Sequence, residues 1–202
     1  LDWEGAIQLT RVTPPAPTIH AENEELVADM EAPRTRGRVL RKAAYVYDWL
    51  QPMMTLGWEG RMAKRIAESV SLAKGERLLD VGCGTGLLTQ ALAKRFPSAE
   101  VIGLDASPEM IRVAHRKHSL PNCRYEVGVA EVLPLGDNSF DAVVSSLFFH
   151  HVDADLKLRS LREIRRVLRP HGRIAIADMG PPYTLLGRAF SYGAWLFFRQ
   201  PE

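Results

Sequence analysis

Glycines crowd one short stretch of the chain, LLDVGCGTG at residues 78–86. Glycine at positions 82, 84 and 86 removes the Cβ atoms that would hold a ligand away from the backbone, and it permits positive φ angles in a turn. A helix is expected to begin near Thr85, and the unpaired N–H groups of its first turn would point at the same ligand. A dinucleotide-binding G-x-G-x-x-G fingerprint would require glycine where the chain has Leu87, so this loop is predicted to bind another kind of ligand.

Two aspartates are placed to hold the two ends of such a ligand. Asp105 follows the second expected strand, 19 residues after Gly86 (105 minus 86), where a carboxylate could accept hydrogen bonds from both hydroxyls of a ribose. Asp80 lies inside the first expected strand, and a buried carboxylate requires hydrogen-bond donors or a positively charged ligand. We therefore expect an adenosine-like ligand that carries a sulfonium and an ammonium. The alternatives are a plain turn for the glycines and a capping or turn role for Asp105.

His150 and His151 follow the fourth expected strand, at the rim of the same pocket. A neutral imidazole is basic near pH 7, so either ring could deprotonate a bound molecule. Adjacent residues usually point apart, and at most one of the two is expected to face a substrate; a structural or substrate-shaping histidine is the alternative. Further upstream, Tyr47 could close over the ligand together with Tyr45 and Asp48, although aromatic residues at this spacing are as often part of a core.

Short apolar runs alternate with stretches of helical spacing after residue 74, and these elements must position the pocket. The runs predict strands at 78–81, 101–104, 123–127, 142–145 and 173–177. Helices are expected between them, and Ser107 and Asp153 are good N-cap residues for two of these helices. In the helix after Asp153, the expected buried stripe is Leu158, Leu161, Ile164 and Leu168, with the arginines mostly outside. This alternation predicts an α/β fold, with a parallel sheet and helices on both of its faces.

The chain divides into four expected regions. Prolines and acidic residues make residues 1–37 an extended or mobile arm. Two entrance or cap helices are expected in residues 38–73, the second of them over 59–70, and the sheet occupies residues 74–180. Residues 181–202 predict an apolar C-terminal helix that is too rich in aromatic side chains for a free tail. This helix is expected to pack on the body of the protein, on another subunit or on further sequence.

Composition argues against several classes of function. The net charge of +2 is too small to indicate a nucleic-acid partner. Cys83 and Cys123 lack metal-ligand spacing, so we expect reduced thiols in a cytoplasmic protein and no metal site. No run of about 18 apolar residues predicts a membrane-spanning helix. The N-terminus also lacks the order of charged and apolar residues that marks a signal peptide.

Four segments, in this order, resemble the class I S-adenosylmethionine-dependent methyltransferases. LLDVGCGTG is similar to the first motif of that family, GLDAS to its ribose-binding acidic loop, FDAVVSS to its fourth strand and LRPHGRIAIAD to its fifth. Upstream, YDWLQPMMTLGWEGRMAKR is similar to the entrance helix of the quinone-biosynthesis C-methyltransferases. The resemblance covers residues 75–180 and implies a three-layer αβα Rossmann-like fold with a mostly parallel sheet. Members of the family complete the sheet with two more strands, for which this chain has no obvious sequence.

The resemblance also implies which residues bind the cofactor, S-adenosylmethionine. Asp80 and the glycine loop would hold the methionine moiety, and Asp105 would hold the ribose. The full set implied is Asp80, Gly82, Cys83, Gly84, Gly86, Asp105, Ala106, Met110, Ala130, Glu131 and Ser145, with Ala106 and Met110 flanking the adenine. Where the family commonly has an aspartate that receives the adenine amino group, this chain has Val129. We therefore expect weaker cofactor binding, with the N–H of Ala130 still able to contact the ring.

Methyl transfer from a sulfonium is an in-line displacement on an activated donor, so the protein mainly aligns the acceptor and excludes water, and no metal is required. The chain lacks the asparagine-proline-proline-tyrosine signature of amide-nitrogen methyltransferases, and we expect a small, partly apolar or aromatic acceptor. A lipidic acceptor would bring the protein into contact with a membrane surface, and the aromatic residues 191–202 could form a homodimer interface. The alternative is a non-catalytic protein that binds S-adenosylmethionine or S-adenosylhomocysteine for regulation or assembly.

Overall fold

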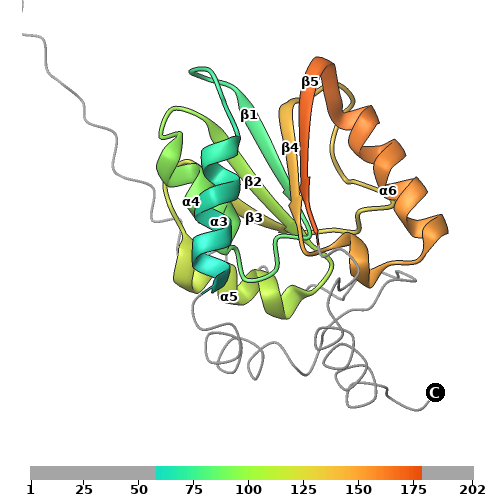
Figure 1. Cartoon of the computed structure of the whole chain (residues 1–202), viewed down its shortest axis with the longest axis horizontal. Helices are drawn as coiled ribbons and strands as arrows, with labels where there is room; N and C mark the ends of the chain where they lie inside the picture. The colour runs from blue at the N-terminus through green and yellow to red at the C-terminus, as the bar shows by residue number, and fades with distance from the viewer. Residues whose placement is uncertain (1–57, 179–202) are drawn as a thin grey trace, which may run out of the picture.

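A computed structural model describes residues 58–178, which form a five-stranded sheet flanked by helices (Figure 1). The elements in chain order are α3 Trp58–Ser69, β1 Arg77–Val81, α4 Leu87–Arg95, β2 Glu100–Asp105, α5 Pro108–His118, β3 Cys123–Val127, β4 Phe140–Ser146, the 3₁₀ turn η1 Phe149–His151, α6 Ala154–Val167 and β5 Leu168–Ala177. The five expected strands and the helix expected at 59–70 are confirmed. The N-terminal arm, the first entrance helix, Tyr47 and the aromatic C-terminal segment lie outside the described residues.

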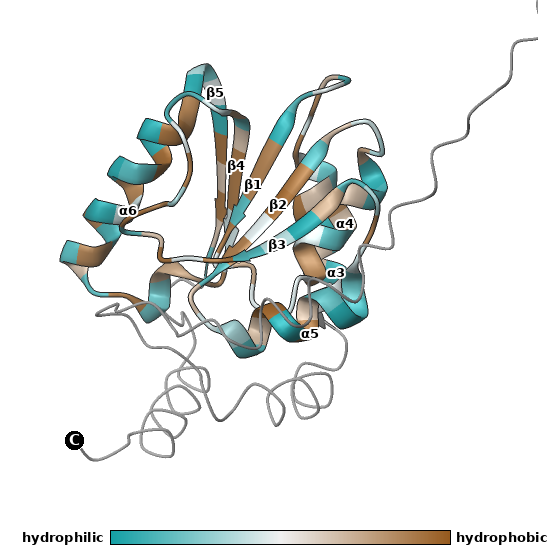
Figure 2. Cartoon of the chain, turned by 180° about the vertical axis from the view of Figure 1, so that it is seen from behind, coloured by the Kyte–Doolittle hydropathy of each residue, from teal (hydrophilic) through white to brown (hydrophobic). Residues whose placement is uncertain are grey.

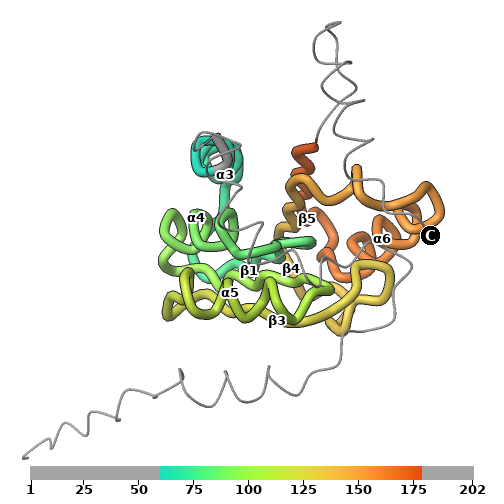
Figure 3. The backbone as a smooth tube through the Cα atoms, turned by 90° about the horizontal axis from the view of Figure 1, so that it is seen from below, coloured from blue at the N-terminus to red at the C-terminus, as the bar shows by residue number. Residues whose placement is uncertain are grey.

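The five described strands are parallel, in the order β3-β2-β1-β4-β5. The chain adds β2 and β3 on one side of β1 and then places β4 on the other side, so the strand order reverses between β1 and β4. In sheets of this kind, ligands bind beyond the carboxyl ends of the strands at this point of reversal. The expected three-layer arrangement is confirmed, since α3, α4 and α5 cover one face and α6 covers the other (Figure 3).

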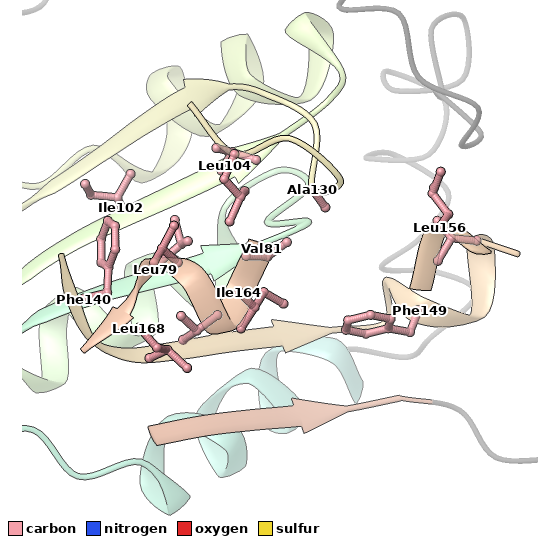
Figure 4. Packing of buried hydrophobic residues seen from close by; sticks show 14 residues of the cluster. Leu79, Val81, Ile102, Leu104, Ala130, Phe140, Phe149, Leu156, Ile164 and Leu168 are labelled. Atoms are coloured by element: carbon pink, nitrogen blue, oxygen red, sulfur yellow. The ribbon is translucent and has the colours of Figure 1, made fainter. Parts of the chain in front are cut away.

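Two apolar layers hold the sheet between its helices. Successive residues of β1, Leu78 and Leu79, are fully buried on opposite faces, as expected of a strand covered on both sides. Leu79, Ile102 and Ile164 belong to the layer between the sheet and α6 (Figure 4). The central strands β1, β2 and β4 are largely hydrophobic, whereas much of α6 is hydrophilic (Figure 2). This packing gives the strand ends a rigid base for the loops beyond them.

The buried stripe of α6 differs from the expectation. Leu158 and Leu161 are 57% and 39% exposed. The residues that the helix buries are Leu156, Ser160, Ile164 and Val167. The polar Ser160 lies at the centre of this stripe and interrupts its apolar pattern. The more apolar Leu158 and Leu161 therefore led to the prediction of a neighbouring face of the helix. The strand β5 also begins earlier than expected, at Leu168, with a register shift opposite Phe140 and Ala142.

Both expected helix caps are confirmed. Ser107 Oγ accepts a hydrogen bond from the Met110 N–H at 3.3 Å, and Asp153 Oδ1 accepts one from the Leu156 N–H at 2.8 Å. Each cap satisfies a backbone donor that the first turn of a helix leaves unpaired. The first cap also fixes the start of α5 next to the end of β2, where the candidate site lies.

Candidate functional site

The glycine loop, residues 82–86, connects β1 to α4 at the carboxyl end of the sheet. Its backbone is tied to the neighbouring strand, because the N–H groups of Gly82 and Cys83 both donate to Leu104 O, at 2.8 and 3.0 Å. The N–H of Gly86 donates to Cys83 O at 3.0 Å, which closes the turn just before α4 begins. The loop is therefore positioned by backbone contacts and by β2.

Each glycine of the loop has a positive φ, between 53° and 87°, which residues with a Cβ rarely adopt. A Cβ on Gly82 would lie 2.7 Å from Phe148 Cδ2, and one on Gly86 would lie 2.6 Å from Tyr125 Cε1. A Cβ on Gly84 would meet no atom within 4 Å. Gly82 and Gly86 therefore allow two aromatic rings to pack against the loop, whereas the open side of Gly84 allows a ligand to approach the backbone.

Asp80 is 1% exposed, and only one of its carboxylate oxygens is satisfied. Oδ2 accepts a 2.7 Å hydrogen bond from Thr89 Oγ1, and Oδ1 is buried with no hydrogen-bond partner among the described residues. Burial raises the pKa of Asp80 to about 7; the Thr89 hydrogen bond opposes this rise, and the charge of Asp105 adds to it. A cationic ligand at Oδ1 would stabilise the ionised carboxylate, which fits the expected ammonium group.

Asp105, the last residue of β2, has the turn and capping role that the sequence offered as an alternative. Its Oδ2 accepts the Gly84 N–H at 2.9 Å, and its Oδ1 accepts the Ser107 N–H at 2.9 Å. One carboxylate therefore fixes both the glycine loop and the start of α5. Burial raises the pKa of Asp105, and these backbone hydrogen bonds oppose the rise. Each oxygen has a further lone pair, so the carboxylate could also accept ribose hydroxyls.

Two of the implied cofactor residues, Ser145 and Cys83, direct their side chains into the protein. Ser145 Oγ donates a 2.8 Å hydrogen bond to Val81 O and so joins β4 to β1. The Cys83 thiol lies against Gly103, and burial raises the pKa of this thiol, which makes it a poor nucleophile. Of the other implied residues, the buried ones are Met110 and Ala130, and the half-buried ones are Ala106 and Glu131.

Two side chains of α6 hold the segment that follows Ala130. Glu163 Oε2 accepts the Leu133 N–H at 2.8 Å, and Arg166 donates to the carbonyl oxygens of Leu133 and Leu135 at 3.0 and 2.8 Å. Arg166 also pairs with Glu163 Oε2 at 2.7 Å and thereby lowers the pKa of Glu163. Arg159 and Arg162 are exposed as expected, whereas Arg166 is half-buried, because its guanidinium caps the carbonyl groups of a neighbouring loop.

His150 and His151 lie in η1, just beyond β4. Their ring centroids are 3.8 Å apart with 43° between the ring planes, so the expectation that the two side chains point apart is wrong. Successive side chains point apart in a strand, but these residues lie in a tight 3₁₀ turn. His150 Nδ1 is 2.6 Å from Asp178 Oδ1. The preceding Phe148 packs against the position where Gly82 lacks a Cβ, which places this turn beside the glycine loop.

These groups fit a nucleoside that carries a cationic amino-acid end. The unpartnered oxygen of Asp80 suits an ammonium, Asp105 can accept ribose hydroxyls, and the Cα of Gly84 faces open space. Among residues 58–178, no three His, Cys, Asp or Glu side chains are grouped as metal ligands. Over the same range, no helix is long and apolar enough to cross a membrane.

Comparisons with known proteins agree with this fit. A family model described as a methyltransferase domain matches residues 79–176. The demethylmenaquinone methyltransferase of Thermotoga maritima is 33% identical over 157 residues, which are 77% of this chain and 67% of that protein. Across relatives with this name, the chain spans about half to two thirds of the other protein's length.

Solved structures show the same fold. A methyltransferase of Haloferax volcanii, solved in complex with the Trm112 methyltransferase activator, has a TM-score of 0.60 at 27% identity over 70% of this chain and 62% of that chain. Phosphoethanolamine N-methyltransferase 2 of Haemonchus contortus, in complex with S-adenosyl-L-methionine, has a TM-score of 0.54 at 26% identity over 65% of this chain and 32% of that chain. This chain therefore belongs to the class I S-adenosylmethionine-dependent methyltransferases, with S-adenosylmethionine as its cofactor.

Proposed function

We propose that this protein transfers the methyl group of S-adenosylmethionine to a small, partly apolar or aromatic acceptor. The observation that carries the proposal is the buried Oδ1 of Asp80, which has no hydrogen-bond partner among the described residues. The ammonium of the cofactor would donate to this oxygen and stabilise the ionised carboxylate. Asp105, bound to the Gly84 N–H, is then available to the ribose of the same molecule.

The bound cofactor supplies an activated methyl group on a positively charged sulfur. The residues of the protein hold the acceptor in line with that group, exclude water and accept a proton where the acceptor must lose one. Phe148, beyond the carboxyl end of β4, is half-buried and packs on the core residue Phe149 with 5.1 Å between the ring centroids, and an aromatic ring beside the glycine loop would favour an apolar or aromatic acceptor. We assign His150, in the same turn, as the proton acceptor.

The relatives named demethylmenaquinone methyltransferases support an acceptor with a quinol ring. A phenolic ring of this kind is already acidic, so a single imidazole is a sufficient base. A quinol with a long apolar tail would also bring the protein to a membrane surface, and sedimentation with lipid vesicles would detect such binding. A homodimer formed through residues 191–202 is a separate proposal, which light scattering of the full chain would test.

Methyl-labelled cofactor tests the proposed reaction directly. The purified chain is incubated with labelled S-adenosylmethionine and reduced demethylmenaquinone in detergent, and label in the quinol fraction is measured. We expect labelled product with the wild type and with Asp155→Asn, which removes an exposed carboxylate paired with Arg159 on α6. Asp80→Asn should form far less product at the same cofactor concentration. No label above background with the wild type would exclude this acceptor.

A second candidate function is cofactor binding without turnover, for regulation or assembly. The observation that favours it is Val129, which stands where the family commonly has an adenine-binding aspartate and whose carbonyl accepts the Val132 N–H at 3.3 Å in a tight turn. A cell extract supplied with labelled cofactor separates the two functions. Tight cofactor binding with no labelled product from either the quinol or the extract would favour the non-catalytic protein.

A further inference from the structure

Asp178 and His150 form a close carboxylate–imidazole pair beyond the carboxyl ends of β5 and β4. Asp178 Oδ1 lies 2.6 Å from His150 Nδ1, and Asp178 Oδ2 accepts the backbone N–H of His150 at 3.0 Å. Both carboxylate oxygens therefore bind the same residue. The side chains of His150 and Asp178 are 23% and 18% exposed, and both residues lie at the surface of the described part of the chain.

The two strands bring this pair together. Pairing of β4 with β5 continues to Ser146 and Ala177, and the Leu147 N–H then donates to Ala177 O at 2.9 Å. Leu147 has a φ of 54°, a value that is strained for a leucine, and the chain turns sharply there into η1. Backbone strain that persists at the end of a strand, next to a binding loop, is typical of functional sites.

The turn that carries His150 begins beside the cofactor loop. A Cβ on Gly82 would be 2.7 Å from Phe148 Cδ2, and η1 begins at the residue after Phe148. The His151 ring packs next to that of His150, with 3.8 Å between their centroids. The imidazole of His150 is thus held at Nδ1 by Asp178 and along its ring by His151.

We propose that Asp178 is a positioning residue, which keeps the ring proton of His150 on Nδ1 and so makes Nε2 the basic atom that serves the acceptor. An ionised carboxylate can only accept a hydrogen bond, so Nδ1 must carry the proton, and the neutral ring keeps its lone pair on Nε2. The inference rests on the proposed methyl transfer. The acceptor forms a bond to the methyl carbon with its own electron pair, the carbon–sulfur bond breaks toward sulfur, and the proton lost by the acceptor moves to Nε2.

Nitrogen-15 NMR of the full chain with labelled histidine tests the tautomer, because protonated and unprotonated ring nitrogens have well-separated chemical shifts. His150→Gln identifies the His150 signals. Asp178→Asn keeps the size of the side chain but offers an amide that can donate to Nδ1, and Asp178→Glu retains a carboxylate. Asp155→Asn is the matched control, because it removes a carboxylate that is 58% exposed and pairs with Arg159.

At a pH where the ring is neutral, we expect the wild type and Asp155→Asn to carry the proton on Nδ1, and Asp178→Asn to shift it toward Nε2. With reduced demethylmenaquinone as the acceptor, Asp178→Asn should lower kcat about 100-fold with the KM for the cofactor unchanged. Asp178→Glu should restore part of this loss. Adding Asp178→Asn to His150→Gln should slow the reaction no further, because the two residues act as a unit.

An unchanged tautomer in Asp178→Asn would overturn the proposal. A fall in kcat that is fully additive in the double variant would overturn it as well, because Asp178 would then act independently of His150. Failure of the wild type to methylate the quinol would instead count against the proposed acceptor. The tautomer measurement would still decide the role of Asp178 in that case.

Discussion

Thr89 Oγ1 on α4 donates a 2.7 Å hydrogen bond to Asp80 Oδ2 on β1. The glycine loop connects these two elements, so the bond ties together the residues on either side of the loop. It satisfies one oxygen of a carboxylate that is 1% exposed and leaves Oδ1 buried with no hydrogen-bond partner among the described residues. A half-satisfied buried carboxylate destabilises the cofactor-free protein and favours the binding of a cation.

The cofactor-free protein should lose stability as the pH rises from about 4 to about 7. The pKa of Asp80 rises from its ordinary 3.8 to about 7 on folding, so the folded state keeps a proton that the unfolded state loses in this range. A shift of roughly 3 units at 1.36 kcal/mol each gives about 4 kcal/mol. Chemical denaturation near pH 4 and near pH 8 measures the free energy of unfolding. Between these pH values it should fall further in the wild type than in Asp80→Asn, by about this amount. Parallel curves for the two proteins would rule out a proton held by Asp80.

Gly82→Ala should lower the free energy of unfolding by about 3 kcal/mol, because the new Cβ meets Phe148 and the residue must keep a positive φ. Gly60→Ala is the matched control: it lies in α3 with no atom within 4 Å of the added Cβ, and should stabilise the protein by about 0.5–1 kcal/mol. The double variant with Gly82→Ala and Phe148→Ala should lose less free energy of unfolding than the two single variants lose in sum. Additive costs, measured by urea denaturation, would show that the clash with Phe148 is not the cause.

Arg166→Ala should destabilise the protein by about 2 kcal/mol, because it removes charge-assisted hydrogen bonds to the carbonyl oxygens of Leu133 and Leu135. The same change should weaken cofactor binding several-fold, since the released segment directly follows Ala130. Arg159→Ala, which breaks an exposed pair with Asp155 on the same helix, should cost about 0.5 kcal/mol or less and leave cofactor affinity unchanged. Equal effects of the two substitutions on calorimetric affinity would contradict a specific role for Arg166.

Val129→Asp should tighten cofactor binding about tenfold, because a carboxylate at this half-buried position would accept a hydrogen bond from the adenine amino group. Val129→Asn offers a similar size without the charge and should give a smaller gain. Calorimetric titration of S-adenosylmethionine against the three proteins measures the difference. An unchanged dissociation constant in Val129→Asp would show that this residue does not contact the adenine.

Local pattern was enough to predict the strands and helix caps, because each depends on residues close in sequence. The run at 123–127 became β3 with the same limits, and Ser107 and Asp153 cap helices as expected. The stripe of α6 was misjudged because its buried centre is a serine, Ser160, while the more apolar Leu158 faces outward. The packing of neighbouring elements, which the sequence of one helix does not contain, decides this rotation.

Site residues such as Asp80 and Asp105 could be predicted because each lies in a recognisable motif and has a side chain suited to the ligand. Contacts between residues that are distant in sequence could not be predicted. Tyr125 reaches Gly86 across 39 positions, and Asp178 reaches His150 across 28. Asp178 closes the segment LRPHGRIAIAD, and its role follows only once β5 is placed beside β4. A carboxylate at the end of that strand is the signal that could have directed attention to the pair.

A crystal structure of the complex with S-adenosylhomocysteine tests the central claim most directly, namely that two carboxylates hold the two ends of the cofactor. We expect the ammonium nitrogen about 3 Å from Asp80 Oδ1, with Thr89 still bound to Oδ2, and the ribose hydroxyls on Asp105. An ammonium bound elsewhere, with Asp80 Oδ1 still unpartnered, would contradict this claim.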